Sequence, residues 1–140
     1  MNQNPINRLV KVCGKDVVLP EPNQAAILEY IGEFIRLQQK KAECIEDSSE
    51  DHDKPFCWYR MDENNRVYAC AVGCLIPDDD YNKNIEHNHI TNDRIVSILD
   101  KYGYKQHLGF LRTIQILHDT NEFRVFLQHC QDIVSTMKGA

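Results

Sequence analysis

Hydrophobic residues near the start of the chain occur in two short runs and then recur with a helical period. Residues 9–12 and 17–19 are β-prone and flank a turn-forming segment, so we predict a β-hairpin over about residues 8–19. Beyond it, hydrophobic residues recur every three or four positions, which indicates one buried face of a helix. That helix should begin at an Asn23 cap and run to about Lys41. Its buried face comprises Ile27, Leu28, Ile31, Phe34 and Ile35.

The middle of the chain predicts a second hairpin followed by a small apolar turn. Residues 56–61 and 67–72 are rich in aromatic and β-branched residues, and the turn-forming residues 62–66 lie between them. The second run is apolar at almost every position, which is typical of a strand buried on both faces. Gly73 then favours a tight turn or a close backbone approach, and Pro77 begins the next segment.

Three helices are predicted in the last third of the chain. Their expected boundaries are Thr91 or Asn92 to Gly103, about His107 to His118, and from a cap at Thr120 onwards. The last of them carries an unbroken apolar stripe at helical spacing. The loops between these helices are short, so the helices should be close neighbours. We therefore predict a single α+β domain over residues 1–140, in which a small antiparallel β-hairpin or sheet packs against about four α-helices.

The composition is that of an ordinary globular protein, with 42% hydrophobic and 26% charged residues. There is no apolar run of about 18 residues, so we expect no membrane-spanning helix. The N-terminus lacks the layout of a secretory signal, which predicts a cytoplasmic location. In that setting the six cysteines are interpreted as reduced, buried hydrophobes. A net charge of −5 disfavours direct binding of nucleic acid and leaves open a partner with a basic surface.

Acidic residues cluster in one segment, which we predict to be a surface loop over about residues 46–54. Five of the eight residues from 46 to 53 are acidic, and like charges at this density resist packing. Two interpretations stay open: a merely solvated loop, and a patch that binds a basic partner. The acids are Glu46, Asp47, Glu50, Asp51 and Asp53.

Cysteine and histidine residues supply possible zinc ligands, but their spacing is not that of a zinc motif. Cys70 and Cys74, with Cys57 upstream and His87 and His89 downstream, provide sulfur and nitrogen donors. Structural zinc sites usually show two close pairs of ligands, and these residues do not. Two buried thiols on a turn explain the spacing equally well. A reactive thiolate is also disfavoured, because the surroundings are apolar and no base lies nearby in the sequence. We predict no metal and no cofactor.

Two groups of carboxylates suggest further chemistry. Asp78, Asp79 and Asp80 offer the hard oxygen ligands that Mg²⁺ and Ca²⁺ prefer, but they lack the alternating pattern of a calcium loop. Acids after a proline also suit a turn or the start of a helix. His118-Asp119 is a metal-binding dyad in one class of phosphohydrolases, which requires further ligands. At a helix end, His118 would more simply contact the last carbonyls.

Aromatic and charged residues around the second hairpin form a predicted rim for binding a partner. Trp, Tyr and Arg recur as anchors in protein interfaces and as stacking platforms for bases, although an aromatic residue of a hairpin commonly packs on the core. With the acidic loop, the predicted partner-binding residues are Trp58, Tyr59, Arg60, Asp78, Asp79, Asp80 and Tyr81. The predicted structural hub is Cys70, Gly73, Cys74, Pro77, His118 and Asp119.

Three blocks of the chain form a pattern: Tyr59-Arg60, Cys70-Ala-Val-Gly-Cys-Leu-Ile-Pro-Asp-Asp-Asp-Tyr81 and Phe110-Leu111-x2-Ile114-Gln115-x2-His118-Asp119. Together they resemble a family of small uncharacterised proteins of bacteriophages, prophages and bacteria. The family pattern is C-A-[IV]-G-x-L-I-P-D-x-x-Y, then F-L-x-x-L-Q-x-x-H-D and a closing amphipathic helix. The resemblance covers roughly residues 24–137. This chain departs from the pattern in its N-terminal hairpin, in its acidic loop and at Ile114.

The resemblance implies a phage or mobile-element accessory protein and brings no settled activity with it. We therefore expect a non-enzymatic binding protein that inhibits or modulates a host protein or a defence complex, as anti-CRISPR proteins do. One alternative is a binder of nucleotide signals that uses Trp58, Tyr59 and Arg60. The other is a small metal-dependent phosphohydrolase that uses His118 and Asp119 with the three aspartates. The sequence leaves the oligomeric state open.

Overall fold

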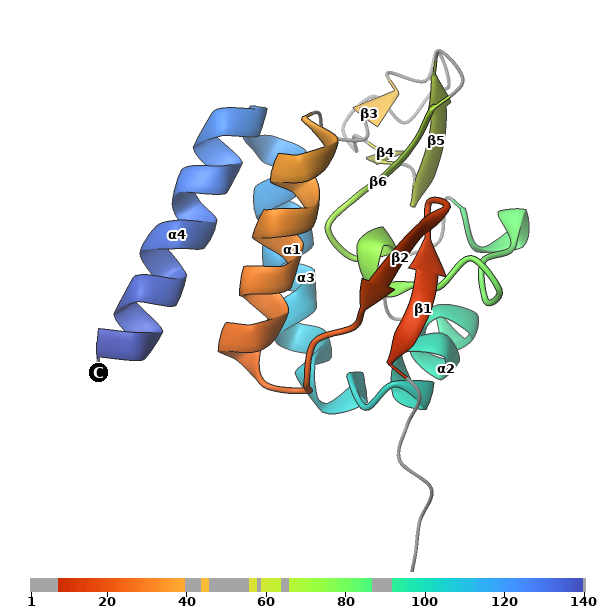
Figure 1. The fold of residues 1–140 in the computed structure, drawn as a ribbon, viewed down its shortest axis with the longest axis horizontal. Coiled ribbons are helices and arrows are strands. Elements are labelled where there is room, and N and C mark those ends of the chain that lie inside the picture. Colours follow the sequence, from red (N-terminus) through yellow and green to blue (C-terminus); the bar gives the residue numbers. More distant parts are fainter. Residues whose placement is uncertain are drawn as a thin grey trace, which may run out of the picture.

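The computed structural model describes residues 8–39, 44–45, 56–57, 59–63, 66–86 and 92–139 (Figure 1). Within these ranges the chain forms four α-helices and three two-stranded antiparallel sheets, so the predicted α+β class is confirmed. The acidic segment at about 46–54 and Trp58 lie outside the described residues, as do His87, His89 and Thr91.

The N-terminal hairpin pairs β1 (Leu9–Val12) with β2 (Lys15–Val18), as predicted. Val12 is opposite Lys15, so Cys13 and Gly14 form a two-residue turn. Both turn residues have positive φ angles, 53° and 77°, which matches the type I′ turn favoured by the twist of a hairpin. The turn is therefore determined locally, with glycine at one of its two left-handed positions.

Helix α1 (Gln24–Gln38) begins at the predicted cap, where the Asn23 side chain accepts a hydrogen bond from the Ala26 N–H at 2.8 Å. It ends earlier than predicted, because Gln39 adopts a left-handed conformation and its N–H bonds to the carbonyl of Arg36. All five predicted apolar positions are buried. The Gln38 side chain is buried as well.

The second hairpin is shorter than predicted. The run expected over 56–61 divides into β4 (Phe56–Cys57), which pairs with β3 (Cys44–Ile45), and β5 (Arg60–Glu63), which pairs with β6 (Arg66–Ala69). The strand expected to reach residue 72 ends at Ala69, because the chain turns there into the 3-10 helix η1 (Gly73–Leu75). Arg66 and Val67 are exposed, so burial on both faces holds only for the last two residues of β6.

The C-terminal part contains α2 (Asp93–Lys101), α3 (Leu108–Thr120) and α4 (Phe123–Gly139), with the 3-10 helices η2 (Lys83–Ile85) and η3 (Lys105–His107) between the longer elements. Asn92 caps α2, and Gly103 ends it with a φ angle of 89°. The prediction that Thr120 caps the last helix is wrong. Thr120 belongs to α3, where its hydroxyl donates to the carbonyl of Ile116 at 2.8 Å. The chain then needs two more residues to reverse direction before α4.

Helix α1 packs against α4 and contacts η1, and in Figure 1 the strands and α4 lie on opposite sides of α1. Residues 68–77, from the end of β6 through η1, are all buried. The core therefore has the 68–77 segment at its centre, enclosed by helices on one side and by hairpins on the other.

Candidate functional site

The turn around Gly73 packs directly on the backbone of residue 59. A Cβ atom on Gly73 would lie 2.3 Å from the carbonyl oxygen of Tyr59, far inside van der Waals contact. Only glycine allows this approach, since backbone atoms cannot move aside as a flexible side chain can. Gly73 thus joins the start of β5 to the buried turn.

Arg60 is buried, and its guanidinium group holds the same turn together. Nη1 donates to the carbonyl of Gly73 at 2.6 Å and to that of Tyr59 at 3.2 Å. Nη2 donates to the carbonyl of Ile76, and it also lies 3.2 Å from Oδ1 of Asp78. A guanidinium suits this position because it presents five donors in a rigid plane. The guanidinium of Arg60 therefore bonds to carbonyl and carboxylate groups inside the fold.

Glu86 is a second buried charged residue in the same region, and the sequence pattern did not predict its role. Its carboxylate accepts hydrogen bonds from the backbone N–H of Tyr59 at 2.8 Å, from the N–H of Arg60 at 3.0 Å and from the hydroxyl of Tyr81 at 2.6 Å. These bonds pin the first residues of β5 against the segment that follows η2. No local pattern marks Glu86, because its partners lie 5 to 27 positions away.

The aspartate run is largely tied into the fold. The Asp78 carboxylate accepts from the N–H groups of Cys13 and Gly14 at 2.8 and 2.9 Å, so it caps the turn of the N-terminal hairpin. Asp80 accepts from the Tyr102 hydroxyl at 2.5 Å and from the Lys101 ammonium at 3.0 Å. These two acids position the segment after Pro77 between the hairpin and α2.

The structure thus changes the predicted partner-binding rim. Tyr59 and Arg60 are buried, and the carboxylates of Asp78 and Asp80 bond within the fold. Tyr81 is half-buried, with its ring 5.2 Å from the Arg60 guanidinium. Of the three aspartates, Asp79 alone is exposed. The physical reason is that this segment folds back onto β5 and the hairpin turn, which the sequence pattern does not reveal.

The His118-Asp119 pair forms part of a polar network that fastens α3 to the buried turn. The Gln115 side chain accepts from the Val72 N–H at 2.9 Å and donates to Asp119 at 2.7 Å. Nδ1 of His118 lies 3.0 Å from the same Asp119 oxygen, and the buried imidazole packs nearly perpendicular to the Phe126 ring, with the ring centres 5.3 Å apart. In the part of the chain that the structure describes, no three His, Cys, Asp or Glu side chains are placed to hold a metal ion.

The two thiols of the turn are fully buried. Burial raises the pKa of Cys70 and Cys74, and nearby Asp119 raises that of Cys70 further. The Cys70 sulfur accepts from the Gly73 N–H at 3.2 Å, and the Cys74 thiol donates to the carbonyl of Ala71 at 3.0 Å. Neutral, hydrogen-bonded thiols of this kind serve as core groups rather than as nucleophiles.

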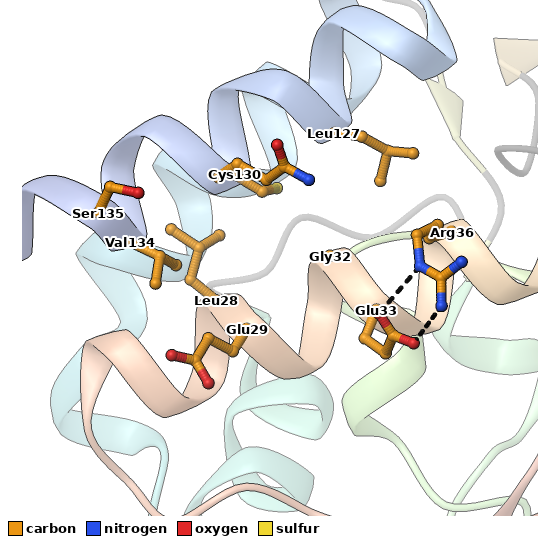
Figure 2. A pocket seen from close by; sticks show the side chains of 10 residues that line it. Leu28, Glu29, Gly32, Glu33, Arg36, Leu127, Cys130, Val134 and Ser135 are labelled. Atoms are coloured by element: carbon orange, nitrogen blue, oxygen red, sulfur yellow. Dashed lines mark hydrogen bonds and ion pairs between the residues drawn. The ribbon is translucent and has the colours of Figure 1, made fainter. Parts of the chain in front are cut away.

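An open groove of about 530 Å³ lies along the seam between α1 and α4 (Figure 2). Its apolar lining comprises Leu28, Gly32, Leu127, Cys130 and Val134, and its polar lining comprises Glu29, Glu33, Arg36, Gln131 and Ser135. No pattern in the sequence predicted this groove. Gly32 lets the two helices approach closely beside it, because an added Cβ there would lie only 3.3 Å from the Cβ of Cys130.

Ion pairs border this groove. Arg36 donates to Glu33 at 3.0 Å, which lowers the pKa of the Glu33 carboxyl, and Lys138 pairs with Glu29. These side chains are 45% to 62% exposed. Exposed pairs of this kind exchange partners at little cost, since each contributes at most about 1 kcal/mol. The groove therefore combines an apolar floor with an edge of exposed ion pairs.

Comparisons of the sequence with protein-family models, with curated proteins and with solved structures found no match. Across the described ranges, no helix is both long and apolar enough to cross a membrane. What supports a function for this α+β protein is therefore the chemistry of its own residues.

Proposed function

We propose that this protein is a non-enzymatic binding protein, encoded by a phage or another mobile element, that acts in the host cytoplasm. It inhibits or modulates a host protein or a host defence complex. The observation that supports this proposal is that the polar groups of the hub are buried and bond within the fold. Arg60 and Glu86 are buried and form hydrogen bonds within the fold, and Nδ1 of the buried His118 lies within hydrogen-bond distance of Asp119.

Burial also weighs against the two alternatives. A nucleotide binder would need Tyr59 and Arg60 at the surface, where they could stack on a base and contact a phosphate, yet both lie in the core. A phosphohydrolase would need His118 to reach a metal or a substrate, and its side chain has no exposed surface. The concave, accessible surface described above is instead the α1–α4 groove, which suits binding rather than bond-making chemistry.

The resemblance to phage proteins supports the proposed setting, and the charge of −5 supports a partner with a basic surface. The acidic segment remains our candidate for an electrostatic contribution. Neutralising it replaces Glu46, Asp47, Glu50, Asp51 and Asp53 by the matching amides.

Affinity capture from bacterial lysates, followed by binding measurements with the purified partner, tests the proposal. We expect one stoichiometric partner, whose activity falls when the protein is added. The neutralised variant should keep its melting temperature and bind more slowly at low salt, because steering by charge acts mainly on the association rate. Failure to recover a partner across salt concentrations, or hydrolysis of a phosphate ester by the purified chain, would refute the proposal.

A further inference from the structure

Two cysteines occupy directly opposite positions in the shortest of the three sheets that the structure describes. Strand β3 pairs with β4 through two residue pairs, and one of them is Cys44 with Cys57. Directly opposite residues of an antiparallel pair have Cα atoms about 4.5–5.5 Å apart, and they share one face of the sheet. A disulfide requires a Cα separation of about 4.4–6.8 Å. The register therefore places these two cysteines where one disulfide can join them.

The fold holds the chain on either side of this pair. Gln38, six positions before Cys44, is buried, and its side chain exchanges hydrogen bonds with the backbone of Ala69 at 2.8 and 3.1 Å. Tyr59, two positions after Cys57, is buried, and its N–H donates to a buried carboxylate at 2.8 Å. Because both flanks are fixed, little further conformational entropy is lost when the two cysteines join. The effective concentration of one thiol near the other should thus exceed that of a flexible segment.

The four other cysteines are present as free thiols and are less suited to oxidation. Cys70 and Cys74 are fully buried, and their sulfur atoms form hydrogen bonds within the turn. Cys130 is buried on α4, and Cys13 is half-buried in the turn of the N-terminal hairpin. Buried thiols react slowly, since the thiolate is the nucleophile and burial disfavours its charge. Oxidation should therefore select the pair in β3 and β4.

We propose that Cys44 and Cys57 are a redox-sensitive pair, joined across β3 and β4 by a reversible disulfide. The oxidant is a low-molecular-weight disulfide such as oxidised glutathione. One cysteine thiolate attacks it, which forms a mixed disulfide and releases one glutathione. The other cysteine thiolate attacks the protein sulfur of the mixed disulfide, which forms the new bond and releases the second glutathione. Two protein thiols thus lose two electrons and two protons, and one glutathione disulfide becomes two glutathione thiols.

The bond determines how firmly β3 and β4 stay paired. A ladder of two residue pairs is marginal by itself, and a covalent bond between its strands keeps them together. The Cβ atoms of opposite residues are about 4.5–5.5 Å apart, whereas a relaxed disulfide brings them to about 3.8 Å. The bond therefore carries strain and is readily reduced, as reversible disulfides are. This inference is independent of the proposed function, because it concerns two thiols and one pair of strands.

Equilibration of the full chain in glutathione buffers tests the inference. The reduced protein is incubated at a series of ratios of reduced to oxidised glutathione, free thiols are then blocked by alkylation, and the chain is digested at glutamate. Cleavage at Glu46 and Glu50 leaves the two cysteines on separate peptides, so mass spectrometry detects any bond between them. We expect a Cys44–Cys57 peptide in monomeric protein. Its effective concentration should be at least about 10 mM, against about 1 mM for a flexible segment.

Two variants test whether the register is responsible. Cys44→Ser combined with Ile45→Cys moves the thiol by one position, from the face shared with Cys57 to the opposite face of β3. This register variant should lower the effective concentration at least about tenfold. The control Cys13→Ser removes the half-buried thiol and should leave the effective concentration within about twofold of the wild type.

Amide hydrogen exchange of the wild type adds a readout that needs no variant. The hydrogen-bonded N–H groups of residues 44–45 and 56–57 should exchange at least about tenfold more slowly in the oxidised protein than in the reduced protein. Any of four results would overturn the inference. They are absence of the Cys44–Cys57 peptide at every ratio, an equal effective concentration in the register variant, disulfide-linked dimers in place of the internal bond, and unchanged exchange on oxidation.

Discussion

Replacing Gly73 by alanine tests whether the buried turn is as tightly packed as the structure shows. The new methyl carbon would lie 2.3 Å from the Tyr59 carbonyl oxygen and 3.1 Å from both the carbonyl carbon and Cα of Tyr59. All three are backbone atoms, so no change of rotamer relieves the contact. The start of β5 must therefore move away from η1, which also stretches the 2.6 Å bond between Arg60 and the Gly73 carbonyl.

The expected cost follows from this geometry. Bringing the shortest contact from 2.3 Å to an acceptable 3.0 Å requires a shift of about 0.7 Å in a fully buried segment. Overpacking of this kind typically costs about 1–3 kcal/mol. Because the clashing Tyr59 atoms belong to the backbone and cannot change rotamer, we expect Gly73→Ala to lower the free energy of unfolding by about 3 kcal/mol. A 140-residue domain has an unfolding entropy of about 0.3 kcal/mol/K, so the melting temperature should fall by about 10 °C.

Differential scanning calorimetry of the wild type and two glycine variants measures this effect. Gly109 is the matched control, because it is exposed on α3 and an added Cβ there meets no atom within 4 Å. Gly109→Ala should melt at or slightly above the wild-type temperature, since alanine is the better helix former. A Gly73→Ala protein that melts within about 2 °C of the wild type would refute the close approach of the turn to Tyr59.

Arg60→Lys should destabilise the fold by about 3 kcal/mol in urea denaturation, because one ammonium cannot reach every carbonyl that the guanidinium bonds; a loss below about 1 kcal/mol would contradict the network. Alkylation of the native protein, read by peptide mass spectrometry, should modify the half-buried Cys13 well before the buried Cys70 and Cys74, and equal rates would show that the turn opens readily. Burial raises the pKa of Cys130 to about 12, so the folded state keeps a proton that the unfolded chain releases above about pH 8.5. The contribution of this thiol to stability should be fully present below that pH and be lost as the pH rises toward 12. In wild type the free energy of unfolding should therefore fall with pH between pH 9 and 10, and Cys130→Ala should make that fall shallower by up to about 1 kcal/mol per pH unit. An unchanged slope would show that the thiol is exposed to water.

Elements that depend on neighbouring residues could be predicted from the sequence. Asn23 caps α1 because its side chain reaches an N–H three residues away, and the Cys13-Gly14 turn requires only the left-handed conformation that the two residues adopt. The limits of the elements were less predictable. The strand β6 ends at Ala69 because the chain turns into a buried 3-10 helix, and a run of small apolar residues is compatible with either strand or turn.

The candidate site was predicted less well, since its contacts join residues that are far apart along the chain. Residue type alone places Arg60 at the surface, because arginine is seldom fully buried. The structure buries it where carbonyls 13 and 16 positions away converge on its guanidinium. The role of Glu86 was not predicted for the same reason, because its carboxylate bonds to the N–H groups of Tyr59 and Arg60, which lie 27 and 26 positions earlier in the chain.

The sequence by itself determined the helical periods, the caps at Asn23 and Asn92, the N-terminal turn and the α+β class, because each follows from interactions within a few residues. Tertiary structure alone decided that Tyr59, Arg60 and Asp78 bond within the fold rather than form an exposed rim, because their partners are distant backbone groups and the buried Glu86. It also decided the position of the open groove. The groove is lined by residues of α1 and α4, and Gly32 and Cys130, which face each other across these helices, are nearly a hundred positions apart, so no local pattern predicts it.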